Sequence, residues 1–160
     1  MKYNDVINHP SLKDYFGKNS EKWIDALNSL VEKKNLGEKE VDDKEARELL
    51  NRSFKFSWLG FFFQFYWAAY HNINGWINVC LMFGFLQAID TLFFEANYAW
   101  NISIVVSMLY GIFGKSLLLG SKADELTKTS NLSSPSWGRV AVSILIIFVS
   151  ILIPVTIAEL

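Results

Sequence analysis

Residues 137–158 read WGRVAVSILIIFVSILIPVTIA, and Arg139 is the only charged side chain among these 22 residues. Because a helix rises about 1.5 Å per residue, this stretch is long enough to cross the roughly 30 Å hydrocarbon core of a bilayer. Two further apolar stretches, 75–94 and 102–120, have similar lengths. The sequence therefore predicts an all-α membrane protein with transmembrane helices at 75–94, 102–120 and 137–158.

Charge is concentrated in the first third of the chain. Residues 1–55 hold 11 of the 15 Lys and Arg residues and 11 of the 16 Asp and Glu residues. A single soluble domain spreads its charges along the chain, so this split excludes one and indicates a helical head at 1–53 before a membrane-embedded domain at 54–160. The net charge of −1 argues against a nucleic-acid-binding protein, and no nucleic-acid partner is expected.

The head has helical apolar spacing. Ser20 is placed to cap a helix, and Asp42 and Glu45 have the spacing of a capping box that opens another. A head of about 50 residues is marginal as an independent fold, so it is expected to dock on the membrane, on the embedded helices or on a second copy. The polar segment 121–136 reads as a flexible loop.

A fourth stretch, 54–72, is short for a span and unusually aromatic. Trp and Tyr favour the headgroup level of a bilayer, which favours an interfacial or re-entrant helix. The head, Lys122 and Lys128 then lie on one side, and the other side carries only Glu95 and Glu159. Because positive residues stay inside, this arrangement places the N-terminus in the cytoplasm. In the alternative, residues 54–72 cross the membrane and the chain has four transmembrane helices. Lys122 and Lys128 then lie on the outer side.

Within this stretch, residues 56–73 read FSWLGFFFQFYWAAYHNI. The segment resembles the signature F-N-W-A-A-F-F-F-G-P-x-W-x-x-Y-R-K-M of the bacterial domain-of-unknown-function family 2628, small inner-membrane proteins. The resemblance covers about residues 55–120, and the matching positions are Phe56, Trp58, Phe61, Phe62, Phe63, Trp67 and Tyr70.

The departures from that signature are local. Gln64 and Phe65 stand where the signature has Gly-Pro, and His71 and Asn72 stand where it has Arg-Lys. Loss of Gly-Pro argues against a break in this helix. The resemblance implies the bacterial inner membrane and no established activity or catalytic residue.

If 56–71 is one helix, its small and polar residues share a stripe, which holds Ser57, Gly60, Gln64, Ala68 and His71. Trp58 and Trp67 belong to the aromatic remainder. The stripe is expected to face a neighbouring helix or lipid headgroups. In a second interpretation Gln64 and His71 line a polar path or bind a headgroup, and His71 acts as a proton-sensitive switch.

The third apolar stretch carries a small-residue series at helical spacing, consisting of Ser103, Ser107, Gly111 and Gly114. Small residues let helix backbones approach closely in a membrane, so this series, together with Gly60, predicts helix packing. The partner helix belongs either to the same chain or to a second copy, and a homo-oligomer or a membrane-complex partner is expected.

Ionisable residues inside spans are costly and are functional candidates by default. Asp90 is expected to bond to Ser103 or Ser107, and Lys115 to extend past Asn78 towards the cytoplasmic interface. A possible intramembrane polar site therefore consists of Asn78, Gln87, Asp90, Ser103, Ser107, Tyr110 and Lys115, with Gln87 beside Tyr110.

Known catalytic motifs are missing from the sequence, and an enzyme is not expected. Cys80 is the single cysteine and the two histidines lie far apart, so no metal site and no cofactor are predicted. The first 20 residues contain no apolar signal segment, so the head is expected to stay in the cytoplasm.

The leading functional hypothesis is a small integral membrane scaffold protein, anchored by its helices among membrane lipids and meeting a partner through its head. The alternatives are a small channel or transporter component with a polar path near Asp90, and a lipid-sensing or stress-response membrane protein that uses the aromatic helix.

Overall fold

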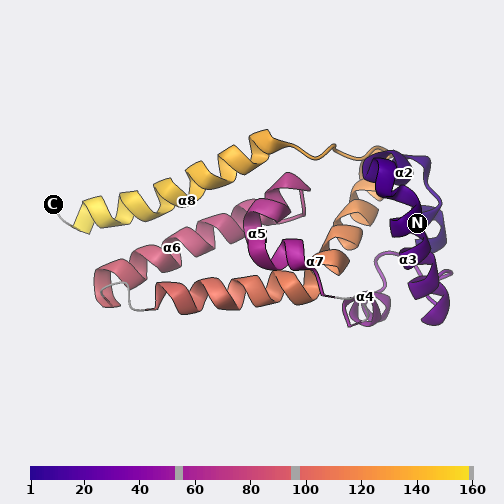
Figure 1. Ribbon diagram of the computed structural model, residues 1–160, viewed down its shortest axis with the longest axis horizontal. Coiled ribbons are helices and arrows are strands. Elements are labelled where there is room, and N and C mark those ends of the chain that lie inside the picture. Colours follow the sequence, from indigo (N-terminus) through magenta and orange to yellow (C-terminus); the bar gives the residue numbers. More distant parts are fainter. Residues whose placement is uncertain (53–55, 95–97, 159–160) are drawn as a thin grey trace. The chain divides into compact units, whose positions relative to one another are not determined.

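The computed structural model describes residues 1–52, 56–94 and 98–158 (Figure 1). Glu95, Glu159 and the expected boundary between residues 53 and 54 lie outside the described residues. The chain divides into two compact units. The head unit is Met1–Lys55 with Lys115–Pro135, and the membrane unit is Phe56–Gly114 with Ser136–Leu160. All regular structure in the described part is helical, which confirms the predicted fold class.

The N-terminal part of the head unit contains short helices: α1 (Tyr3–Ile7), α2 (Pro10–Phe16), the 3-10 turn η1 (Gly17–Asn19), α3 (Ser20–Lys33) and α4 (Lys44–Asn51). The cap of α4 is Asp43, not Asp42, because the Asp43 carboxylate accepts hydrogen bonds from the backbone N–H groups of Glu45 (2.9 Å) and Ala46 (3.2 Å). Asp42 instead forms an ion pair with Arg47.

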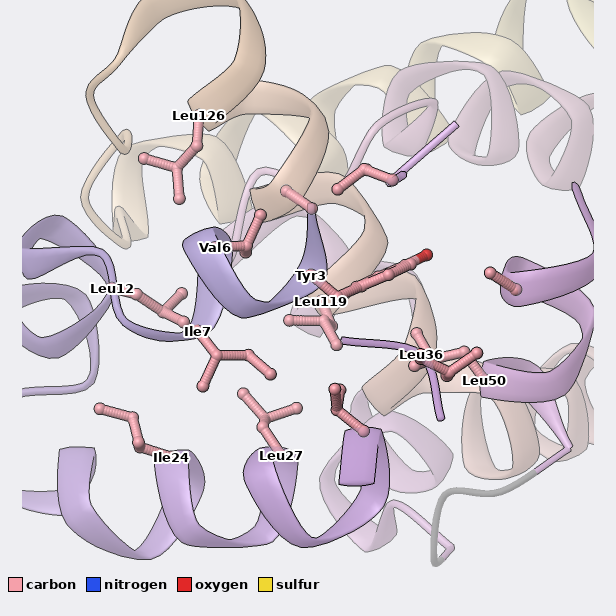
Figure 2. Packing of buried hydrophobic residues seen from close by; sticks show 14 residues of the cluster. Tyr3, Val6, Ile7, Leu12, Ile24, Leu27, Leu36, Leu50, Leu119 and Leu126 are labelled. Atoms are coloured by element: carbon pink, nitrogen blue, oxygen red, sulfur yellow. The ribbon is translucent and has the colours of Figure 1, made fainter. Parts of the chain in front are cut away.

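The head core is completed by a segment distant in sequence. Helix α7 runs from Ala99 to Thr129, and its last part places Leu119, Ala123 and Leu126 in one apolar cluster with residues of α1 to α4. Figure 2 shows Leu119 and Leu126 of this helix facing Tyr3 and Val6. The expected flexible loop at 121–136 is therefore wrong over 121–129, which is helical. The predicted transmembrane range 102–120 lies within α7, and the division into units falls inside it, between Gly114 and Lys115.

This shared core constrains how often the chain would cross a membrane. Residues 1–50 and 119–126 pack in one cluster, so they lie on the same side of a bilayer. The chain between them must then cross an even number of times, and two long apolar helices supply those crossings. This packing favours three spans over the four-span alternative, in which Lys122 lies opposite the head.

Three helices of the chain are long and apolar enough to cross a membrane among the described residues. They are α6 (Trp76–Phe94), α7 over Asn101–Thr129, and α8 (Trp137–Ala158). Figure 1 shows α6 and α8 side by side. Their contact is close at Gly84, where an added Cβ would lie 2.5 Å from the Cβ of Ser150. The remaining helix of the membrane unit is α5 (Trp58–Tyr70).

Candidate functional site: a broken aromatic helix

The aromatic segment forms α5, whose two halves have different surroundings. In the first half, Trp58–Phe63, the large side chains other than half-buried Phe61 are exposed, with Trp58 at 65% and Phe62 at 66%. We call this segment the aromatic half-helix. In the second half, Phe65, Trp67, Ala68 and Ala69 are buried. The first half therefore presents its side chains outward, and the second half packs inside the membrane unit.

The two halves meet at a backbone break. Gln64 has φ 43° and ψ −121°, which is not helical. The expectation that loss of Gly-Pro would leave this helix unbroken is therefore wrong. The Gln64 side chain explains how a non-glycine residue holds this conformation, since its Nε2 donates to Ser107 Oγ and to the Ser103 carbonyl oxygen (3.4 Å).

Contacts with α7 show that α5 descends along α7 and returns. At its start, the Ser57 N–H donates to the Gly111 carbonyl oxygen (2.7 Å), and at its middle Gln64 reaches Ser107 and Ser103. Beyond the break, the ring of Trp67 lies 3.2 Å from the position of a Cβ on Gly114. Four to eight residues of α7 separate Gly111 from the level of Gln64, a descent of about 6–12 Å. Half of a hydrocarbon core is roughly 15 Å, so this descent is shorter than the depth of one leaflet.

The C-terminal end of α5 is held by the beginning of α8. Arg139 donates from Nε to the carbonyl oxygen of Ala69 (3.0 Å) and from Nη2 to that of Tyr70 (3.2 Å). The Ser136 N–H donates to the same Tyr70 oxygen (3.0 Å), and the rings of Tyr70 and Trp137 lie 5.0 Å apart. Both ends of α5 thus lie at the end of the membrane unit where the chain leaves for the head.

The expected stripe of small and polar residues on α5 makes its contacts with other residues of the same chain. Ser57 is the N-cap of α5 and accepts from the Gly60 N–H, and an added Cβ on Gly60 would lie 2.5 Å from the Tyr110 carbonyl oxygen. Ala68 is fully buried, whereas His71 is half-buried and contacts the rings of Trp67 and Tyr70.

The small-residue series of α7 also faces α5. Ser107 bonds to Gln64, a Cβ on Gly111 would overlap the ring of Phe56, and Gly114 lies against Trp67. These small residues are therefore used within the chain, which answers the question that the sequence left open about the partner helix.

Asp90 does not bond to Ser103 or Ser107, contrary to expectation. Its side chain is 2% exposed, and Oδ1 accepts from the backbone N–H of Tyr98 (3.0 Å), the residue before α7. Within the described part of the chain, Oδ2 accepts no hydrogen bond.

The other members of the predicted polar site are dispersed. Asn78 is exposed, Gln87 is half-buried, and the carbonyl of Gln87 accepts from the Thr91 hydroxyl (2.9 Å). Tyr110 is buried against Gly60, and Lys115 belongs to the head unit. The structure thus gathers Gln64, Ser103 and Ser107 into one polar contact rather than the seven residues into one path.

Sequence reasoning missed a buried ion pair in the head unit. Lys122 is fully buried, and its Nζ lies 2.8 Å from Glu125 Oε2 and 4.8 Å from the centre of the Tyr15 ring. Ser133 donates its N–H to Glu125 Oε1 (2.6 Å). Burial raises the pKa of Glu125, but the hydrogen bonds from Lys122 and Ser133 outweigh it and hold that pKa below its usual value. The sequence pattern that could have predicted this pair is the spacing of three residues between Lys122 and Glu125. It lies beside apolar residues at helical spacing, Leu119, Ala123 and Leu126.

No group of three or more His, Cys, Asp or Glu side chains is placed to hold a metal ion in the ranges that the structure describes. Comparison with protein-family models, with curated proteins and with solved structures finds no match.

Proposed function

We propose that this chain is a membrane-anchored interaction module, with its apolar helices among the lipids and its folded head meeting a partner. The observation that carries the proposal is the distribution of large exposed apolar side chains. Apart from Met1 and Leu117, all of those in the described residues belong to the membrane unit. This partition suits a body solvated by lipid that carries a second body solvated by water. The proposal includes no catalytic role.

We place the module in the inner membrane of a bacterium, with its N-terminus in the cytoplasm. The resemblance of the aromatic segment to family 2628 supports the membrane, and the positive charges support the orientation. Lys115, Lys122 and Lys128 belong to the head unit, and Arg139 lies at the end of the membrane unit next in the chain to it. Positive residues concentrate on the cytoplasmic side of bacterial inner membranes.

The surface of the head indicates the chemistry of its partner. Most of its large apolar side chains are buried, many of them in a single cluster, and its exposed residues carry both signs of charge. Exposed charges are screened by salt, so binding through this surface weakens as ionic strength rises. The partner is therefore expected to present a polar, charge-complementary face rather than an apolar groove.

Photo-crosslinking from single positions in native membranes tests the proposal. A photoreactive amino acid is placed at Glu21, Asp25 or Ser29, which are exposed on α3 at intervals of four, and at Glu48 on α4 as a comparison. We expect one adduct of constant mass from positions that share a face, and loss of this adduct at high salt. Recovery of uncrosslinked monomer from every position would contradict the proposal.

A homo-oligomer is one possible identity of that adduct, with twice the mass of the chain. The small residues of α5 and α7 already contact each other within the chain, so self-association would use the head or another surface. An adduct of twice the chain mass that forms only from head positions would assign the partner as a second copy.

Passage of a small cation is a second candidate, because Asp90 is buried with one oxygen that accepts no hydrogen bond in the described residues. An unpaired buried acceptor attracts a cation or a proton donor. Flux into liposomes containing the protein, compared between the native chain and Asp90→Asn, tests it. Flux that is unchanged in Asp90→Asn would remove Asp90 from any path.

A further inference from the structure

The re-entrant course of α5 makes the membrane unit unequal in the two leaflets. Helices α6, α7 and α8 are long enough to cross both leaflets, whereas α5 descends about 6–12 Å along α7 before Trp67 returns to the level of Gly114. In the described residues, one leaflet therefore holds an additional helix that the other leaflet lacks. That leaflet is the one at which the chain leaves for the head, since Ser57 and Tyr70 both lie at this end.

The side chains of the aromatic half-helix enlarge this difference. Trp58, Leu59, Phe62 and Phe63 are 54–66% exposed, and the rings of Trp58 and Phe62 are stacked with centroids 5.9 Å apart. They surround a helix that packs on α7 through Gly60, so their exposed faces point away from the protein. At this depth the surrounding solvent is lipid, because α7 beside them is an apolar span.

The inequality has a physical consequence for the lipids. A helix inserted in one leaflet adds area there alone, and aromatic and leucine side chains fill the gaps between loosely packed lipids. Such insertion is more favourable where the head-side leaflet is stretched, as on the outer surface of a small vesicle. We propose that the aromatic half-helix makes this protein prefer a head-side leaflet with packing defects, so that the bilayer itself is the ligand.

Sorting of the full-length protein among vesicles of different size tests the proposal. The chain is labelled at Ser29→Cys in the head, while native Cys80 is buried and stays unlabelled. It is reconstituted into phosphatidylcholine–phosphatidylglycerol liposomes from about 50 to about 400 nm across, and its density per area is measured on single vesicles. An impermeant quencher separates molecules with the head outside from those with the head inside.

Head-outside molecules are expected to be about threefold denser on the smallest vesicles than on the largest, and head-inside molecules to show the opposite trend. The double variant Phe62→Ala/Phe63→Ala is expected to remove most of this dependence. The matched control is Phe85→Ala/Phe148→Ala, which truncates two phenylalanines of similar exposure, 56% and 59%, in the middle of α6 and α8. This control variant is expected to keep the dependence of protein density on vesicle size.

Equal density on all vesicle sizes, or the same trend for both orientations, would overturn the proposal. An equal loss in the two double variants would show a general effect of apolar truncation and would also overturn it. The comparison of orientations in the native chain decides the matter even if a variant inserts poorly, because it needs no substitution in α5.

Discussion

The guanidinium group of Arg139, in the first turn of α8, caps α5 by donating to the carbonyl oxygen of Tyr70 at 3.2 Å. These residues are 69 positions apart in the chain. The last carbonyl groups of a helix lack partners within it and carry partial negative charge, so a cation placed there both bonds to them and stabilises the dipole. The end of α5 is thereby fixed to the beginning of α8.

Replacing Arg139 tests how much this cap stabilises the membrane unit. Arg139→Ala removes charged donors from two carbonyl groups and is expected to lower the free energy of unfolding by about 1.5–3 kcal/mol. Arg139→Lys keeps the charge but donates from a single point, so roughly half of the loss is expected. Unfolding in detergent, followed by tryptophan fluorescence, gives the comparison. Arg52→Ala, at an exposed site in the head, is the control and should change little.

The re-entrant course predicts which turns are accessible from each side of the membrane. Cysteines introduced singly at Asn74 and Asn131 are expected to react from the head side, and a cysteine at Tyr98 from the other side, because α6 and α7 each cross once. An impermeant maleimide applied to oriented vesicles measures this. Native Cys80 is buried and should not react. Labelling of position 74 from the side opposite the head would show that α5 spans.

The three candidate spans could be predicted from the sequence because a long run of apolar residues is stable in the hydrocarbon core of a bilayer. Helix α8 begins and ends where the composition changes. The end of α7 could not be predicted, because Lys122, Asp124 and Glu125 give residues 121–129 the polar composition that is typical of a loop. The apolar face that Leu119, Ala123 and Leu126 form becomes visible only when the head covers it.

The break in α5 was hidden for a different reason. Nothing local to Gln64 interrupts a helix, and the bonds that stabilise its conformation come from Ser103 and Ser107, about 40 residues later. Tertiary contacts override local propensity here. The same holds for Asp90, whose partner is a backbone N–H of the following turn rather than a serine at its level.

Close approach of α5 to α7 at Gly60 gives a prediction about stability. A Cβ at this position would lie 2.5 Å from the backbone oxygen of Tyr110, which cannot move without displacing α7. Gly60→Ala is therefore expected to destabilise the membrane unit by about 1–3 kcal/mol, the range for overpacking. Gly120→Ala is the matched control, because nothing lies within 4 Å of its added Cβ. In helix α7 this control is expected to be neutral or stabilising by up to about 1 kcal/mol.

Two lysines of α7 allow a buried and an exposed ion pair to be compared on one helix. Lys122 is fully buried beside Glu125, whereas the Lys128 side chain is 69% exposed beside Asp124. Lys122→Met leaves the Glu125 carboxylate without its cation in the head core, and a loss of about 3 kcal/mol is expected. Lys128→Met is expected to change stability by less than about 1 kcal/mol. Hydrogen exchange of head amides in the full-length protein measures both, and equal effects would contradict the assigned role of Lys122.

Acid is expected to destabilise the head through the carboxylates whose pKa is lowered. Hydrogen bonds to Lys122 and Ser133 hold the pKa of Glu125 below its usual 4.5, and the backbone N–H of Ala46 lowers that of Asp43. A lowered pKa contributes stability that is fully present above the unfolded value and is lost as pH falls through the folded one. Head amides should therefore exchange faster as pH falls below about 4.5, after correction for intrinsic rates. The Glu125→Gln variant should have a lower free energy of unfolding at neutral pH and lose less of it in acid.

Added salt should weaken the contribution of the exposed Asp43 carboxylate to stability more than that of the better shielded Glu125, since exposed charges are screened more strongly. An unchanged acid response in Glu125→Gln would show that the carboxylate of Glu125 does not control acid stability.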